Sequence, residues 1–165
     1  MSAGLMLADR FRASTEATTK MMTDLANLQA SLQFTKTPGA LAGASIVALS
    51  SPLLGTVAAK VTAKLQAGWR EADTLVVRTE EVVEAAQVWS RNLALRGDVP
   101  SRMVKFCTAM VEAWTRELDL RRTVLSTLRE PECFAENEDW EAGLLVVREQ
   151  PFLTDVCMRH LNQVE

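Results

Sequence analysis

The sequence has no tyrosine, a single histidine and few residues that interrupt regular structure. Its 165 residues include only 7 glycines and 5 prolines, whereas Ala, Leu, Val, Glu and Arg are abundant. A many-stranded sheet needs frequent turns and favours aromatic and β-branched residues, so this composition argues against one. About half of the residues are apolar (48%) and a quarter are charged (24%), as in ordinary globular proteins. The composition therefore predicts an all-α protein.

The scarcity of histidine also limits the chemistry that the chain can perform. His160 lies near the end of the sequence, with no neighbouring residue suited to orient it as a catalytic base. The Gly-containing segment 39–43 lacks the lysine of a phosphate-binding loop. Cys107, Cys133 and Cys157 are an odd number without metal-ligand spacing, which is typical of reduced thiols in an intracellular protein. We expect no enzymatic activity, no cofactor and no metal site.

Charge is spread along the chain rather than gathered in one run. The 18 basic and 21 acidic residues give a net charge of -3. The densest basic cluster contains Arg116, Arg121 and Arg122, but Glu117 and Asp119 lie among them. This mixture favours a solvated or salt-bridged helix face over a track for phosphate groups. The sequence therefore predicts no direct binding to nucleic acid.

The segment between Lys36 and Lys60 has no charged residue and approaches the length of a membrane span. Pro38 and Pro52 interrupt it, however, together with glycines and serines, and no Trp or Tyr marks its ends. We therefore interpret its first part as a small-residue linker, and we expect no membrane insertion.

Apolar spacing divides the chain into helical segments. An N-terminal helix is predicted within residues 1–34, although its Thr-rich middle, residues 14–20, has little apolar periodicity. The small-residue linker covers residues 35–50. Residues 51–165 follow as a long helix and a C-terminal helical region. The predicted fold is an elongated antiparallel helical hairpin or bundle with coiled-coil character and a short C-terminal helical pair.

The long helix is predicted to begin with Ser51 as its N-cap and to stop at Gly97. Along it, apolar and small residues recur at alternating four- and three-residue intervals, which is the coiled-coil pattern. A seam of this length needs a partner helix, from this chain or another. The seam consists of Leu54, Ala58, Val61, Leu65, Gly68, Ala72, Leu75, Thr79, Val82, Ala86, Trp89 and Leu93.

A third helix is predicted from an N-cap at Ser101 to about Arg129. It carries two adjacent apolar stripes, so we expect it to contact two neighbours. An acidic loop over 130–139 precedes a shorter helix over 139–149. Pro151 is expected to end or kink that helix, before a last helix that reaches Asn162.

The four tryptophans are the most prominent aromatic side chains. Trp89 and Trp114 fall on apolar seams, which favours packing in the core. Trp69 and Trp140 lie less clearly on a seam, so either could instead anchor a partner protein.

Two charged residues interrupt the apolar stripes of the third helix. Glu117 and Arg121 are spaced i, i+4 with the acid first, which is the favourable order for a helical ion pair. They are either an exposed surface pair or a polar patch inside an interhelical seam, where they would fix register or recognise a partner. Their position within both stripes favours the second interpretation.

The segment around this pair resembles the cyclin-dependent kinase 2-interacting protein (CINP) family. That family has an aromatic residue before the pattern basic-Glu-Leu-x-Leu-basic-Arg-Thr-Val, and later Gln-Pro-aromatic. The matching residues here are Trp114, Arg116-Glu117-Leu118, Leu120-Arg121-Arg122-Thr123-Val124 and Gln150-Pro151-Phe152. The resemblance extends over about residues 113–152. Val147 stands where the family has a tryptophan, and Asp119 where it has an apolar residue.

The resemblance implies a nuclear and cytoplasmic adaptor without catalysis. Members of the family belong to an AAA+ ATPase remodelling complex that acts in DNA replication, the DNA damage response and ribosome maturation. There they pair with a second small helical subunit, and they are linked to cell-cycle kinases. The alternative is a structural coiled-coil subunit, of the tethering or kinetochore type, or a homodimeric helical protein. We predict that partners bind through Val61, Leu65, Leu75, Val82, Trp89, Trp114, Arg116, Glu117, Arg121, Arg122, Gln150, Pro151 and Phe152.

Overall fold

The computed structural model describes residues 3–36, 51–130 and 137–161, and it is helical in each of these ranges. The helices are α1 (Ala3–Lys36), α2 (Ser51–Ala94), α3 (Ser101–Arg129), α4 (Asn137–Glu149) and α5 (Pro151–Leu161). The described residues contain no strand, so the predicted all-α class is confirmed. Among them, no helix combines the length and the apolar character needed to cross a membrane.

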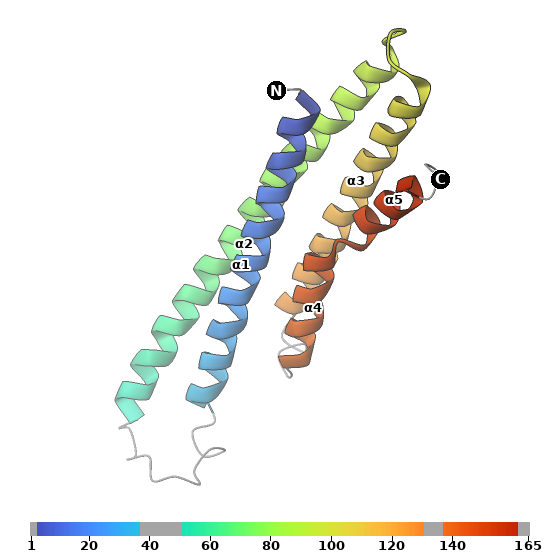
Figure 1. The fold of residues 1–165 in the computed structure, drawn as a ribbon. Helices are drawn as coiled ribbons and strands as arrows, with labels where there is room; N and C mark the ends of the chain where they lie inside the picture. The colour runs from blue at the N-terminus through green and yellow to red at the C-terminus, as the bar shows by residue number, and fades with distance from the viewer. Residues whose placement is uncertain (1–2, 37–50, 131–136, 162–165) are drawn as a thin grey trace.

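The helices form an elongated assembly (Figure 1). α1 and α2 lie side by side and run in opposite directions. α3 turns back along the upper part of α2, and it also contacts α4 and α5. α4 returns beside α3 and contacts α1, after which α5 bends away from the line of α4 to lie against α3. α3 therefore has more than the two neighbours that its stripes predict.

Most helix ends lie near their predicted positions. α1 continues through Thr35 and Lys36, and the rest of the predicted linker lies outside the described residues. The predicted N-cap at Ser101 is wrong, because Pro100 occupies that position and Ser101 is already helical. The Pro100 carbonyl accepts the backbone N–H groups of Met103 at 2.9 Å and of Val104 at 3.2 Å. No side chain caps the start of α3, and the Pro100 carbonyl accepts backbone N–H groups of its first turn.

Two apolar clusters make up the core, one towards each end of the α1–α2 pair. The upper cluster contains Leu7, Phe11, Val82, Val83, Ala86, Val111, Trp114 and Leu118. The lower cluster contains Met21, Met22, Leu25, Leu65, Ala72, Leu125, Leu128, Trp140 and Val147. Along α1 and α3, buried polar side chains lie between the two clusters or at the edge of the upper one, namely Thr15, Thr18, Glu117 and Arg121. The core is therefore interrupted by a polar layer.

The Thr-rich middle of α1 is part of that layer, and its helix is continuous. The hydroxyl of Thr15 donates to the Phe11 carbonyl at 3.1 Å, and that of Thr18 to the Ser14 carbonyl at 2.8 Å. Back-bonding of this kind gives a buried hydroxyl a partner without breaking the helix. Ser14 also shares a hydrogen bond with Thr79 of α2. The region with the weakest apolar periodicity is therefore a polar contact between helices.

Candidate site at the junction of α1, α3 and α5

Glu117 and Arg121 lie one turn apart on α3, and their exposed fractions are 1% and 2%. The interpretation of an exposed surface pair is therefore wrong. Among the ion pairs of the described residues there is none between these two side chains. Each side chain instead reaches a different helix, so the patch connects three elements.

Glu117 holds the start of α5. Its Oε1 atom accepts the backbone N–H of Phe152 at 2.7 Å and that of Leu153 at 3.2 Å. The first N–H groups of a helix have no acceptor within the helix, and a carboxylate at this end also favours the helix dipole. Burial raises the pKa of Glu117, whereas the two backbone N–H groups and the charge of Arg121 act in the opposite direction. Glu117 thus serves as an N-cap supplied from another helix.

The turn that presents these N–H groups consists of one residue. Gln150 separates α4 from α5 and has φ = 46°, the left-handed conformation that is unfavourable for a residue with a Cβ atom. Its carbonyl accepts the N–H groups of Leu153 and Thr154, both at 3.1 Å. Pro151 is the first residue of α5, where a fixed φ is suitable and no N–H is needed. Pro151 therefore begins a new helix, and the sharp bend belongs to Gln150.

Arg121 reaches in the opposite direction, to α1. Its Nη2 atom donates to the Thr15 hydroxyl, and its guanidinium lies 4.8 Å from the centre of the Phe11 ring. The buried Nε and Nη1 atoms have no hydrogen-bond partner among the described residues. Burial lowers the pKa of Arg121 to about 10, and the charge of Glu117 offsets part of this effect. A charged group without full pairing is costly in such a position.

Trp114 belongs to the same junction. Its ring stacks on that of Phe11, with centres 4.9 Å apart and planes at 8°. The prediction that Trp114 and Trp89 pack in the core is confirmed, since Trp114 is buried in the upper cluster and Trp89 packs against it. α1 is thus joined to α3 by one aromatic stack and one charged hydrogen bond.

Arg116 and Arg122 lie on more exposed faces of α3. Arg116 lies over the Phe152 ring, 5.8 Å from its centre, beside a small cavity of about 130 Å³. Arg122 pairs with Glu80 of α2 at 2.7 Å and with Asp119 at 3.4 Å. Arg122 therefore fastens α3 to α2, whereas Arg116 is near the solvent at the contact with α5.

Most of the predicted partner residues of α2 pack against other residues of this chain. Leu65 and Val82 are buried, in the lower and upper clusters respectively. Val61, Leu75 and Trp89 are half-buried. Because α1 lies along α2 and its apolar side chains enter the same clusters, much of the seam is already covered.

Trp69 and Trp140 contact each other, with ring centres 6.0 Å apart. Trp140 is buried in the lower cluster, and Trp69 packs against that cluster beneath the guanidinium of Arg129 at 4.9 Å. Arg129 in turn bonds to Asp73 at 2.6 Å. Both rings therefore have intramolecular contacts.

The eight proposed site residues from Trp114 to Phe152 come from two segments of the sequence. All but Arg122, which pairs with Glu80 of α2, lie at the junction of α3 with α1 and α5. The residues that sequence reasoning missed are Phe11 and Thr15, which face Arg121 from α1. The Ser and Thr residues in the middle of α1 were the sequence feature that could have indicated a polar contact there. In the part of the chain that the structure describes, no cluster of His, Cys, Asp or Glu could hold a metal ion. The side chain of His160 and the residue Cys133 lie outside that part.

No family model, curated protein or solved structure matches the chain in comparisons with known proteins.

Proposed function

We propose that this protein is a non-catalytic adaptor that binds other proteins as a subunit of an AAA+ ATPase remodelling complex. The proposal follows the resemblance to the CINP family, and it includes the nuclear and cytoplasmic location and the roles in replication and ribosome maturation. Its partners would be the ATPase, a second small helical subunit and cell-cycle kinases.

The observation that carries this proposal is the meeting of the two segments that bear the resemblance. Glu117 of the α3 segment caps the helix that begins after Gln150 and Pro151. Arg116 of the same segment covers Phe152. The two segments are distant in sequence, yet they contact each other through hydrogen bonds and a cation–π contact. They are therefore suited to act as one unit. We infer that this unit sets the angle between α3 and α5 and thereby shapes a docking face.

We further propose that the molecule works as an antiparallel helical hairpin with coiled-coil character. The support is the regular seam of α2 and its contact with α1 along both core clusters. Because α1 already lies on this seam, a second helical subunit is expected to use another face. The outer face of α3 is the candidate: Met103 is 54% exposed, and a cavity of about 270 Å³ is lined by Pro100, Arg102, Met103 and Phe106.

Affinity purification of the full chain from its native cells, followed by mass spectrometry, tests the proposal. We expect an AAA+ ATPase and a small helical protein to be recovered in a fixed ratio to the chain. Recovery of the chain alone would contradict the adaptor function. A stable homodimer in light scattering of the purified chain would instead favour the structural coiled-coil alternative.

Two matched variants separate docking on α3 from effects on folding. Met103→Asp adds a charge to the outer face of α3, and we expect it to reduce recovery of the helical partner at least ten-fold. Val77→Asp adds the same charge at a valine of α2 that is 53% exposed, and we expect full recovery. Equal recovery with both variants would exclude the outer face of α3 as the docking surface. Circular dichroism should give the same helix content for both.

A further inference from the structure

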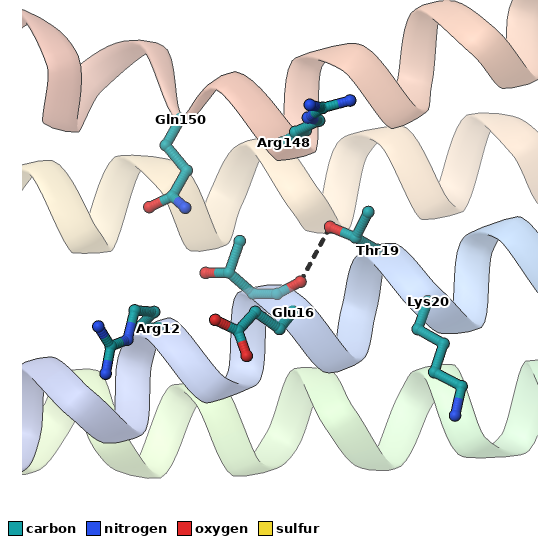
Figure 2. Close-up of a pocket in the computed structure, with 7 residues that line it drawn as sticks. Arg12, Glu16, Thr19, Lys20, Arg148 and Gln150 are labelled. Atoms are coloured by element: carbon teal, nitrogen blue, oxygen red, sulfur yellow. Dashed lines mark hydrogen bonds between the residues drawn. The ribbon is translucent and has the colours of Figure 1, made fainter.

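A cleft lined by polar and charged residues opens between α1 and the junction of α4 with α5 (Figure 2). Its volume is about 480 Å³, within the range of ligand sites in proteins. Gln150 extends from the α4–α5 junction towards α1, where Arg12 and Glu16 lie next to each other. Lys20, Thr15 and Thr19 complete the α1 wall, and Arg148 lies on the opposite one. The cleft is thus lined by two helical elements that the chain brings together.

Positive charge predominates in this cleft, although the whole chain has a net charge of -3. Three cationic side chains line the cleft, Arg12, Lys20 and Arg148, against one carboxylate, that of Glu16. Among the ion pairs of the described residues, only that of Arg12 with Asp9 involves one of these three cations. That pair is exposed, so exchanging Asp9 for another carboxylate costs little.

Arg121 adds a further positive charge behind the wall of the cleft. It donates to the hydroxyl of Thr15, which is itself a lining residue. Because this guanidinium is buried and has two unpartnered nitrogen atoms, solvent screens its charge less than that of a surface arginine. The Glu117 carboxylate, one turn away on α3, offsets part of this charge, so the three lining cations are the main reason that the cleft favours an anionic occupant.

The spacing of the cations indicates what kind of anion fits. Arg12 and Lys20 are separated by two turns of α1, or about 12 Å along the helix axis. Carboxylates at positions i and i+4 of an extended peptide are about 13 Å apart, a spacing that matches these two positions. Glu16 lies between the two cations and disfavours an anion at the centre. None of the lining residues is aromatic, so the cleft has no aromatic side chain on which a nucleobase would stack.

We propose that this cleft binds an acidic, extended segment of a partner protein, with carboxylates of the segment paired to Arg12, Lys20 and Arg148 and its backbone hydrogen-bonded by Gln150. The proposal rests on the proposed function only in taking the occupant to be a protein. It assigns a surface apart from the outer face of α3, and the two can succeed or fail separately.

NMR titration of the purified full chain tests the cleft. The probe is a synthetic peptide with two Glu pairs separated by a short Ser-Gly spacer. We expect amide shifts confined to the α1 turns around Arg12 to Lys20 and to the α4–α5 junction, with binding that weakens as salt rises. Shifts spread over the whole surface, or no shifts at all, would overturn the proposal. Partner recovery from cells is a separate measurement, so a failure here leaves the adaptor function standing.

A pair of double variants provides the matched control. Lys20→Glu with Arg148→Glu reverses two exposed cleft cations, and each reversal is expected to weaken peptide binding about ten-fold. Lys64→Glu with Arg78→Glu makes the same charge change at exposed positions of α2 and should leave binding within about two-fold. If both double variants lost peptide affinity equally, the peptide would be attracted non-specifically by the charge of the chain, and the proposed site would be overturned.

Two further arms identify the anion. A peptide with Gln in place of each Glu should not bind, and a peptide with Lys in those places should bind the cleft variant better than the natural chain. Inorganic phosphate should displace the Glu peptide only at concentrations that act through ionic strength. Saturable binding of phosphate without binding of the Glu peptide would overturn the proposal in favour of a small-anion site.

Discussion

The Glu117 carboxylate of α3 and the backbone N–H of Phe152 in α5 are joined by a hydrogen bond of 2.7 Å. The bond gives α5 its cap two residues after Gln150, whose positive φ separates α4 from α5. It also leaves a carboxylate buried beside an arginine that is not fully paired. The junction therefore combines a stabilising helix cap with two buried charges that cost free energy. Substitutions of Glu117 and Arg121 can measure these contributions separately.

Replacing Glu117 tests the cap. Glu117→Gln retains an oxygen that can accept the N–H groups of Phe152 and Leu153 and removes a buried charge, so we expect its unfolding free energy at pH 7 to lie within about 1 kcal/mol of the natural value. Glu117→Ala leaves the Phe152 N–H without an acceptor, whereas the Leu153 N–H keeps the Gln150 carbonyl, and should lose about 2 kcal/mol. Urea denaturation followed by circular dichroism measures both. Equal losses would mean that the acceptor at this position is unimportant.

The raised pKa of Glu117 predicts a pH dependence with a definite sign. In the unfolded chain the carboxyl group titrates near its ordinary pKa of about 4.3, whereas in the folded chain it holds its proton to a higher pH. Between the two values the folded state binds more protons, so the contribution of Glu117 to stability is present at low pH and falls as pH rises.

The measurement compares the natural chain with Glu117→Gln from acidic to neutral pH. The natural chain should lose stability relative to the variant as pH increases through this window. If it gains stability instead, the bonds from α5 and the charge of Arg121 outweigh burial, and the carboxylate is favoured in the folded state.

Arg121 is expected to contribute little net stability despite its burial. Arg121→Met keeps the volume and removes a charge with two unpartnered nitrogen atoms, but it also removes the cation beside the buried Glu117 carboxylate, so we expect a net change within about 1 kcal/mol of zero. Thr15 does not lose its own bond, because its hydroxyl donates to the Phe11 carbonyl. Arg121→Ala should lose about 3 kcal/mol through the cavity it creates. A loss with Met as large as with Ala would show that the guanidinium itself holds α1 in place.

The stack of Phe11 on Trp114 is expected to couple α1 to α3. A double-mutant cycle with Phe11→Leu and Trp114→Leu should give an interaction energy of about 1 kcal/mol in urea unfolding. Phe11→Leu combined with Leu128→Ala, in the lower cluster, should be additive within about 0.5 kcal/mol. If the Phe11 and Trp114 substitutions were also additive, the two rings would stabilise the fold only by burying apolar surface, without a specific stacking interaction.

Sequence periodicity predicted the helices because its signals are local. Apolar spacing and the stops before Pro131 and Pro151 depend on residues within one or two turns. Residues 14–20 have little apolar periodicity because their contribution is polar. Thr15 accepts a hydrogen bond from Arg121, which is far away in the sequence. A buried polar layer does not raise apolar periodicity, so the method could not detect it.

The junction itself was only partly predictable. The interruption of two apolar stripes by Glu117 and Arg121 pointed to a polar patch inside a seam, but not to its partners. The cap on α5 depends on the left-handed turn at Gln150, and this conformation follows from how α4 and α5 pack on α3 rather than from a glycine. The sequence also did not determine which helix packs on α2. An apolar seam shows that a neighbouring helix is needed, but it does not show which chain supplies that helix.

Two glycines of α2 test how closely α1 approaches. A Cβ atom on Gly68 would lie 2.7 Å from a terminal carbon of Leu25, a side chain that is 1% exposed, whereas a Cβ atom on Gly55 would meet nothing within 4 Å. Alanine improves helix propensity by about 1 kcal/mol at either position. At Gly68, overpacking of about 1–3 kcal/mol opposes that gain, so we expect a net loss of about 1 kcal/mol.

Gly55→Ala should therefore raise the urea midpoint and Gly68→Ala should lower it, although the two changes are chemically identical. Pairing Gly68→Ala with Leu25→Val, which shortens the opposing side chain, should recover part of the loss, because the clash is with the end of Leu25. If Gly68→Ala is as stabilising as Gly55→Ala, Leu25 has room to move aside. The seam of α2 would then be covered loosely enough for another helix to compete with α1.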